Sequence, residues 1–206
     1  MYSSRPGLVL GFHGCDESIL KEVLLKNPQL RTSENAYDWL GHGIYFWENS
    51  PSRALEYAKL LARKPRKSGA SIKKPAVLGA VIDLGFCLDL LDHKNLSHVE
   101  AAYEILIQTV KKSDFIAPRN KPANELGVDL LIRDLDCAVI ETLHQARKSE
   151  NLKPFDSVKG VFWEGEELYP EAGFREKDHI QVCVRNPNCI KGYFLPRKLN
   201  NSFSPV

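Results

Sequence analysis

The amino-acid sequence predicts a mixed α+β domain with largely antiparallel sheets, and three observations support this prediction. The 206 residues suit one compact domain, so residues 1–206 are treated as a single unit. A hydrophobic fraction of 43% and a formal net charge of only +2 exclude a disordered chain. Strands alternate with helices early in the chain, but the last strands follow one another without helices between them. A doubly wound parallel sheet would need regular alternation throughout.

The first half of the chain contains two predicted strand–helix pairs. Residues 8–12 form a short apolar run bounded by turn residues, which predicts a buried strand. A helix is predicted at residues 18–26, where apolar side chains recur at helical spacing. Residues 44–47 are apolar and aromatic and predict the second strand. Ser50-Pro51 is typical of a helix amino terminus, and this second helix should run to about residue 64.

The second half of the chain is less regular. Residues 76–84 predict a strand, which residues 85–91 continue or bend. Helical spacing recurs on either side of a loop-like stretch, so a helical and loop insertion should span about residues 92–150. Its helices are predicted at residues 97–111 and 135–148, with the loop at 114–127 between them. The remaining predicted strands are residues 160–163, 180–184 and 190–195.

Composition and short motifs exclude several classes of protein. The apolar run at residues 8–12 is too short for a signal-peptide core of about 7–15 residues, so a cytoplasmic location is expected. No apolar run approaches the roughly 18 residues of a membrane span, and no membrane partner is expected. The five cysteines are scattered without a C-x-x-C pair, which indicates neither a disulfide framework nor a metal site. Common hydrolase, phosphate-loop and zinc-protease motifs are absent from the sequence.

Positive charge is concentrated in one stretch of the chain. Residues 59–74 carry seven lysines and arginines and no acidic residue. This stretch is either a solvated loop that follows a helix, or a loop that follows the phosphates of an RNA, DNA or nucleotide partner.

Four residues in two neighbouring segments carry the strongest functional signal. His13 and Gly14 occur in GFHGC, Tyr45 occurs in GHGIYF, and Tyr57 lies on the following helix in ALEYA. Each of them alone would more often be a structural residue of the core. In combination, the segments resemble the ADP-ribosyltransferases of the diphtheria toxin and poly(ADP-ribose) polymerase type. The resemblance covers about residues 8–58 and, more loosely, residues 178–194.

This resemblance implies a fold with two packed, mostly antiparallel sheets that form an NAD cleft with flanking helices. It also implies that NAD is the co-substrate. Two tyrosine rings suit a flat nicotinamide, which stacks between aromatic faces. The implied NAD-binding residues are His13 for a ribose hydroxyl, Gly14 for the carboxamide, and Tyr45 and Tyr57 for the ring. Arg53, at the start of a helix, is a candidate for contact with the pyrophosphate.

One position departs from the family pattern. The resemblance implies a glutamate at the start of a late strand, but the sequence there reads EKDHIQVCV. His179 and Gln181 share one face of that strand and are the candidate replacements for the glutamate, whereas Asp178 would point away unless the strand begins after it. The other candidate catalytic residues are His13 and Tyr45. A glutamine would keep hydrogen bonds to the ribose and lose the charge that stabilises a positive transition state.

The implied function is an NAD-dependent mono-ADP-ribosyltransferase of the toxin or effector type, such as a toxin of an antiviral defence system. It would modify a nucleic acid (RNA or DNA) or a protein and release nicotinamide, and a neutralising antitoxin is a possible partner. Two alternatives remain open at this point. The protein could hydrolyse NAD with water as the acceptor, or it could be an inactive module that keeps the fold to bind a ligand or partner.

Overall fold

A seven-stranded, mostly antiparallel sheet forms the centre of the molecule in the computed structural model, which describes residues 8–26, 28–63, 71–113, 115–123 and 129–204. Among the described strands, only β4 and β7 pair in parallel. The predicted α+β class is therefore confirmed. In spatial order the strands are β4 (Cys87–Asp89), β7 (Ser157–Phe162), β8 (His179–Val184), β2 (Ile44–Glu48), β1 (Val9–Asp16), β3 (Pro75–Ile82) and β9 (Ile190–Phe194). A separate two-stranded sheet contains β5 (Asn120–Lys121) and β6 (Ile132–Arg133).

The seven strands divide into two groups that are joined weakly at the centre. Strand β1 pairs with β3 along its whole length, from Val9 to Asp16. Its pairing with β2 covers only two positions, Gly11 with Glu48 and Phe12 with Trp47. The prediction of two packed sheets is therefore wrong for the described residues, because these two pairs join both groups into one continuous sheet.

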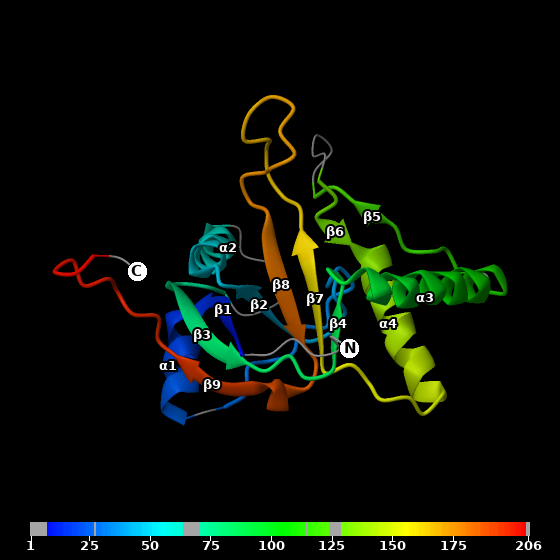
Figure 1. Cartoon of the computed structure of the whole chain (residues 1–206), viewed down its shortest axis with the longest axis horizontal. Coiled ribbons are helices and arrows are strands. Elements are labelled where there is room, and N and C mark those ends of the chain that lie inside the picture. The colour runs from blue at the N-terminus through cyan, green and yellow to red at the C-terminus, as the bar shows by residue number, and fades with distance from the viewer. Residues whose placement is uncertain (1–7, 27, 64–70, 114, 124–128, 205–206) are drawn as a thin grey trace.

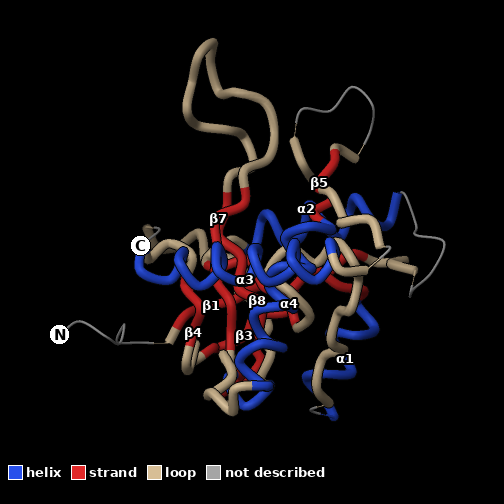
Figure 2. The backbone as a smooth tube through the Cα atoms, turned by 90° about the vertical axis from the view of Figure 1, so that its right-hand side faces the viewer, coloured by secondary structure: helices blue, strands red, loops and turns tan. Residues whose placement is uncertain are grey.

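The described residues form four α-helices, and two of them lie next to the central strands (Figure 1). Helix α1 (Glu17–Lys26) contacts β1, β3 and β9, and helix α2 (Pro51–Arg63) contacts β1, β3 and β2. Helices α3 (His93–Lys111) and α4 (Asp134–Ser149) pack against each other beside β4 and β7, as Figures 1 and 2 show. A short 3-10 helix, η1 (Pro187–Cys189), leads into β9. None of the helices in the described ranges is both long and apolar enough to cross a membrane.

The two faces of the central strands carry different side chains. Paired residues of adjacent antiparallel strands point to the same face, and neighbours along a strand alternate. Phe12, Trp47 and Gln181 therefore share the face that α2 covers, called here the α2 face. His13 and Phe46 lie on the opposite face, called the α1 face, where their rings make an edge contact at 5.8 Å.

Several predicted boundaries differ from the observed ones. Strand β1 continues to Asp16, because β3 pairs with it throughout, so His13 and Gly14 lie inside the strand rather than after it. Helix α3 begins at His93, where the carboxylate of Asp92 accepts the N–H of Lys94. Strand β7 begins earlier than predicted, at Ser157, because it pairs with both β4 and β8. The middle of the basic stretch, residues 64–70, lies outside the described residues.

A long loop between β7 and β8 projects beyond the sheet (Figure 1). It is pinned at its base by Asp178, whose carboxylate accepts the N–H groups of Glu164 and Arg175. The loop begins next to the amino terminus of α2, since Glu164 pairs with Arg53.

Candidate functional site

Strands β1 and β2 separate at Gly14, and this split is the first feature of the candidate site. The N–H of Asn49 donates to the carbonyl oxygen of Leu10 at 2.9 Å, so Leu10 directs its peptide groups toward β2. By alternation, Phe12 and Gly14 direct theirs the same way. Pairing with β2 ends at Phe12, and the N–H and C=O of Gly14 therefore point into the split.

His13, the neighbour of Gly14 on β1, reaches across the split to β2. Its Nδ1 lies 2.8 Å from the carbonyl oxygen of Tyr45. A carbonyl oxygen only accepts, so Nδ1 carries the proton. Burial lowers the pKa of His13 below its ordinary value, against the effect of this hydrogen bond, and keeps the ring neutral. In a neutral imidazole the other nitrogen is an acceptor, so Nε2 suits a ligand hydroxyl.

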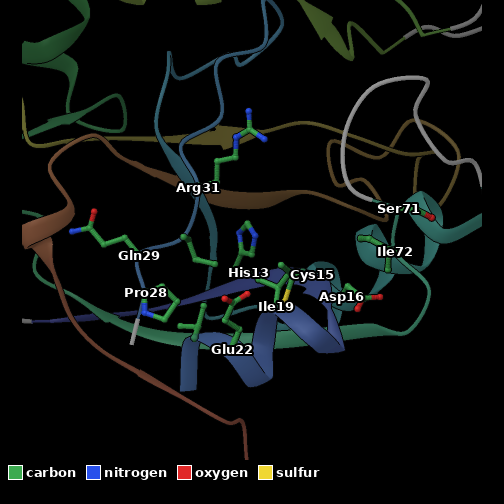
Figure 3. A pocket seen from close by; sticks show the side chains of 13 residues that line it. His13, Cys15, Asp16, Ile19, Glu22, Pro28, Gln29, Arg31, Ser71 and Ile72 are labelled. Carbon is green, nitrogen blue, oxygen red and sulfur yellow. The ribbon is translucent and has the colours of Figure 1, made fainter. Parts of the chain in front are cut away.

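A cavity of about 440 Å³ lies beside His13 on the α1 face (Figure 3). Figure 3 shows Pro28 and Gln29 toward one end, Ser71 and Ile72 toward the other, and His13 between them. Asp16 fixes the second end, because its carboxylate accepts the N–H groups of residues 73 and 74. The volume lies in the range of small-molecule pockets, which run from about 300 to 1,000 Å³. Glu22 and Arg31 add charged groups to its lining.

On the α2 face, Gly14 packs directly against helix α2. A Cβ atom at this position would overlap the carbonyl oxygen of Ala54 and press on the Cβ of Ala58. The glycine is therefore required for the close approach of helix and strand, as well as for access to its own peptide groups.

The side chain of Tyr45 is on the α2 face and is fully engaged there. Its hydroxyl donates to the carbonyl oxygen of Gly41 at 2.8 Å and accepts the N–H of Leu40 at 3.0 Å. The ring packs against a buried cluster that includes Trp39, and burial raises the pKa of the Tyr45 hydroxyl well above its ordinary value. Gly41 adopts a φ of 79°, which turns the chain so that its carbonyl meets the hydroxyl. Tyr45 thus holds the loop before β2 in place.

The ring of Tyr57 contacts the ring of Trp47. The two rings are tilted by 47° with centroids 5.1 Å apart. Trp47 follows Tyr45 by two residues and so shares its face of β2. The sequence interpretation missed Trp47, although this spacing was available as a signal.

The two candidate residues on β8 bind each other. Gln181 donates from Nε2 to Nε2 of His179, 3.0 Å away, and its Oε1 accepts the indole N–H of Trp39 at 2.7 Å. His179 in turn donates from Nδ1 to the carbonyl oxygen of Lys177. Burial lowers the pKa of His179, which agrees with a neutral ring that donates at one nitrogen and accepts at the other.

A continuous row of five rings crosses the α2 face. It runs from Tyr57 through Trp47, His179 and Phe162 to Trp39, with successive centroids 5.1, 6.0, 5.5 and 5.2 Å apart. An arginine stands at each end. The guanidinium of Arg133 lies 4.5 Å from the Trp39 ring, and Arg53 lies near Tyr57 in a shared hollow.

Arg53 is held by two carboxylates rather than standing free for a pyrophosphate. It pairs with Glu56 on its own helix and, at 2.7 Å from Nη2, with Glu164 of the projecting loop. These three residues line a hollow of about 210 Å³ with Tyr57 and Lys177. The side chain of Glu164 is only 21% exposed.

Comparisons with known proteins add little beyond this geometry. No protein-family profile matches the chain, and no solved structure matches it. The uncharacterised protein MJ0359 of Methanocaldococcus jannaschii is 26% identical over 201 residues, which cover 87% of this chain and 83% of that protein. Within the described ranges, no three His, Cys, Asp or Glu side chains are grouped so that they could hold a metal ion.

Proposed function

We propose that this protein is an NAD-dependent mono-ADP-ribosyltransferase. The observation that carries the proposal is the split between β1 and β2, which places the peptide groups of Gly14 and the imidazole of His13 at one opening. A dinucleotide has two ends of different chemistry. The split offers a cavity with apolar walls and charged side chains on one face of the sheet, and aromatic rings on the other.

The adenosine end of NAD fits the cavity on the α1 face. His13 Nε2 would accept a ribose hydroxyl there, and Arg31 at the cavity lining would attract the pyrophosphate. The nicotinamide carboxamide would pair with the N–H and C=O of Gly14 in the split. The nicotinamide ring would then stand near Trp47 and Tyr57, whose faces suit a flat aromatic ligand.

The residues would act mainly by orientation and by excluding water. Cleavage of the nicotinamide–ribose bond releases a neutral ring and builds positive charge on the ribose. Fixed hydrogen bonds at both ends of NAD would hold this bond in one place for an acceptor. Lys59 and Arg63 on α2, beside the same hollow as Tyr57, favour a nucleic acid as the acceptor over a protein. A toxin or effector role with a neutralising partner remains part of the proposal.

A second candidate function is a binding module without turnover. It is favoured by the closed set of hydrogen bonds between Trp39, Gln181 and His179, which leaves these residues paired with one another. Such a module would bind ADP-ribose in the His13 cavity and leave the nicotinamide bond intact.

Radiolabelled NAD distinguishes these functions. The purified protein is incubated with NAD labelled in the adenylate phosphate, with and without cell extract, and released nicotinamide is measured by chromatography. Transfer predicts label in macromolecules that is lost on nuclease or protease digestion. Nicotinamide release without extract indicates NAD hydrolysis, and calorimetric ADP-ribose binding without release indicates the module. A protein that neither binds ADP-ribose nor releases nicotinamide would refute the proposal.

A further inference from the structure

The structure holds a carboxylate at the edge of the aromatic row that does not come from β8. On β8 itself, His179 and Gln181 occupy the positions where the sequence resemblance implies a glutamate, and both side chains are neutral. The loop after β7 supplies an acidic side chain instead. Phe162 pairs with His179 across β7 and β8, and Glu164 lies two residues beyond the end of β7, where its ion pair with Arg53 holds it against α2.

Glu164 is set apart from the other acidic residues of its loop. Its N–H donates to Asp178 at 3.3 Å, and its carboxylate lies 2.7 Å from Nη2 of Arg53. Glu166 and Glu167, in contrast, are exposed. The Glu164 side chain is therefore fixed between α2 and the start of β8.

Two buried donors, one in the aromatic row and one on the partner of Glu164, lack acceptors among the described residues. Within the described part of the chain, the indole N–H of Trp47 and the Nε–H of Arg53 are buried and have no hydrogen-bond partner. Trp47 is only 5% exposed, and its ring contacts both Tyr57 and His179. Buried donors are rarely left unpaired, so these two indicate a ligand with acceptor oxygens at this place.

We propose that Glu164 supplies the catalytic carboxylate of the site. This inference rests on the proposed function. It gives Glu164 the role that the sequence resemblance implies for a glutamate at the start of the late strand. In the reaction, the bond between the ribose C1′ and the nicotinamide nitrogen breaks, and both electrons go to the nitrogen, which becomes neutral. A bond forms between C1′ and the acceptor oxygen or nitrogen. The acceptor's proton passes to the Glu164 carboxylate and then to water.

The surroundings of Glu164 suit this role. Burial raises its pKa, against the opposing effect of Arg53 and Lys177, which makes the carboxylate a better proton acceptor than an exposed one. The charged and titratable groups that face it are Arg53 and Glu56 on α2, Asp129 before β6, Lys177 and Asp178 in the loop, and His179 on β8.

The decisive variant is Glu164→Gln, which keeps an acceptor for Arg53 and removes only the charge. We expect the turnover number for nicotinamide release to fall at least about 100-fold, as for loss of a general base. The KM for NAD and the melting temperature should change little. Glu164→Asp should restore part of the rate. Glu166→Gln, an exposed neighbour in the same loop, is the matched control and should behave as the wild type.

A readout independent of turnover is the titration of the Glu164 carboxyl by carbon-13 NMR. We expect its pKa to change when ADP-ribose is added, and the acid limb of the wild-type pH–rate profile to disappear in Glu164→Gln. An active wild type with an equally active Glu164→Gln variant would overturn this inference alone. A lower melting temperature with an unchanged turnover number would also overturn it, since the residue would then only anchor the loop. A wild type that neither binds nor cleaves NAD would refute the proposed function itself.

Discussion

His13 and Tyr45 are joined by a hydrogen bond although their side chains lie on opposite faces of the sheet. The imidazole of His13 reaches the main-chain carbonyl of Tyr45 at 2.8 Å, at the point where β1 and β2 have stopped pairing. This contact replaces a ladder hydrogen bond and fixes the width of the split. It also explains how two residues with different surroundings can belong to one site.

Replacing His13 by alanine should weaken ligand binding more than folding. The variant loses one hydrogen bond to the main chain, about 1 kcal/mol of the free energy of unfolding. It also loses the acceptor proposed for a ribose hydroxyl, so the Kd for ADP-ribose should rise roughly 10-fold. Calorimetric titration measures the affinity, and Lys21→Ala on the exposed side of α1 serves as the control. An unchanged Kd would exclude His13 from the binding site.

Replacing Gly14 by alanine should displace helix α2. The new methyl group would overlap the carbonyl oxygen of Ala54, and such overpacking costs about 1–3 kcal/mol of the free energy of unfolding. Urea denaturation measures this loss. Gly173→Ala is the matched control, because nothing lies within 4 Å of the position of its Cβ. Equal stability of the two variants would contradict the close packing of α2 on β1.

Replacing Tyr45 by phenylalanine tests its structural role. The variant keeps the ring but leaves the N–H of Leu40 and the carbonyl of Gly41 without their hydroxyl partner. A loss of about 1–3 kcal/mol of the free energy of unfolding is expected for such buried groups. Thermal and urea denaturation check this value. Tyr169→Phe, at a ring that is 57% exposed, should leave stability unchanged. A fully stable Tyr45→Phe protein would show that the hydroxyl is dispensable.

Stability should fall as the pH drops below about 6.5. Burial is the main cause that lowers the pKa of His144 to about 4, while the unfolded chain takes up a proton near pH 6.5. The stabilisation is therefore complete above pH 6.5 and is lost as the pH falls toward 4. The expected slope is up to about 1.4 kcal/mol per pH unit for this residue. The lowered pKa values of His13 and His179 act in the same direction.

Urea denaturation at several pH values between 4 and 7.5 measures that slope. His144→Gln should flatten it, while His93→Gln, at an exposed position, should leave it unchanged. The same slope in all three proteins would show that His144 titrates equally in the folded and unfolded states.

The sequence predicted most of the elements but not how they share the sheet. Apolar spacing located β2, α2 and β3 within one or two residues, because each buries a continuous stripe of side chains. It ended β1 at Phe12, since His13 and Gly14 are not typical strand residues. Their place inside the strand depends on β3, which pairs along their whole length, and local sequence does not report a distant partner.

The same limit applies to the candidate site. Sequence patterns drew attention to His13, Gly14, Tyr45 and Tyr57. The first three lie where β1 and β2 separate, and Tyr57 lies on α2 against Trp47. Their orientation could not be predicted, because it depends on the register between β1 and β2. Contacts between distant segments could not be predicted either. The ion pair of Glu164 with Arg53, for example, joins residues that are 111 positions apart in the sequence.

The order of the strands also has a consequence for biosynthesis. Strand β2 pairs on its outer side with β8, and β3 pairs on its outer side with β9. As the chain leaves the ribosome, β1, β2 and β3 appear early and keep two open edges until residues 179–194 have followed. Unpaired strand edges promote aggregation during folding. A nascent chain that stalls before β8 would thus expose both edges at once, and it would depend on chaperones until synthesis resumes.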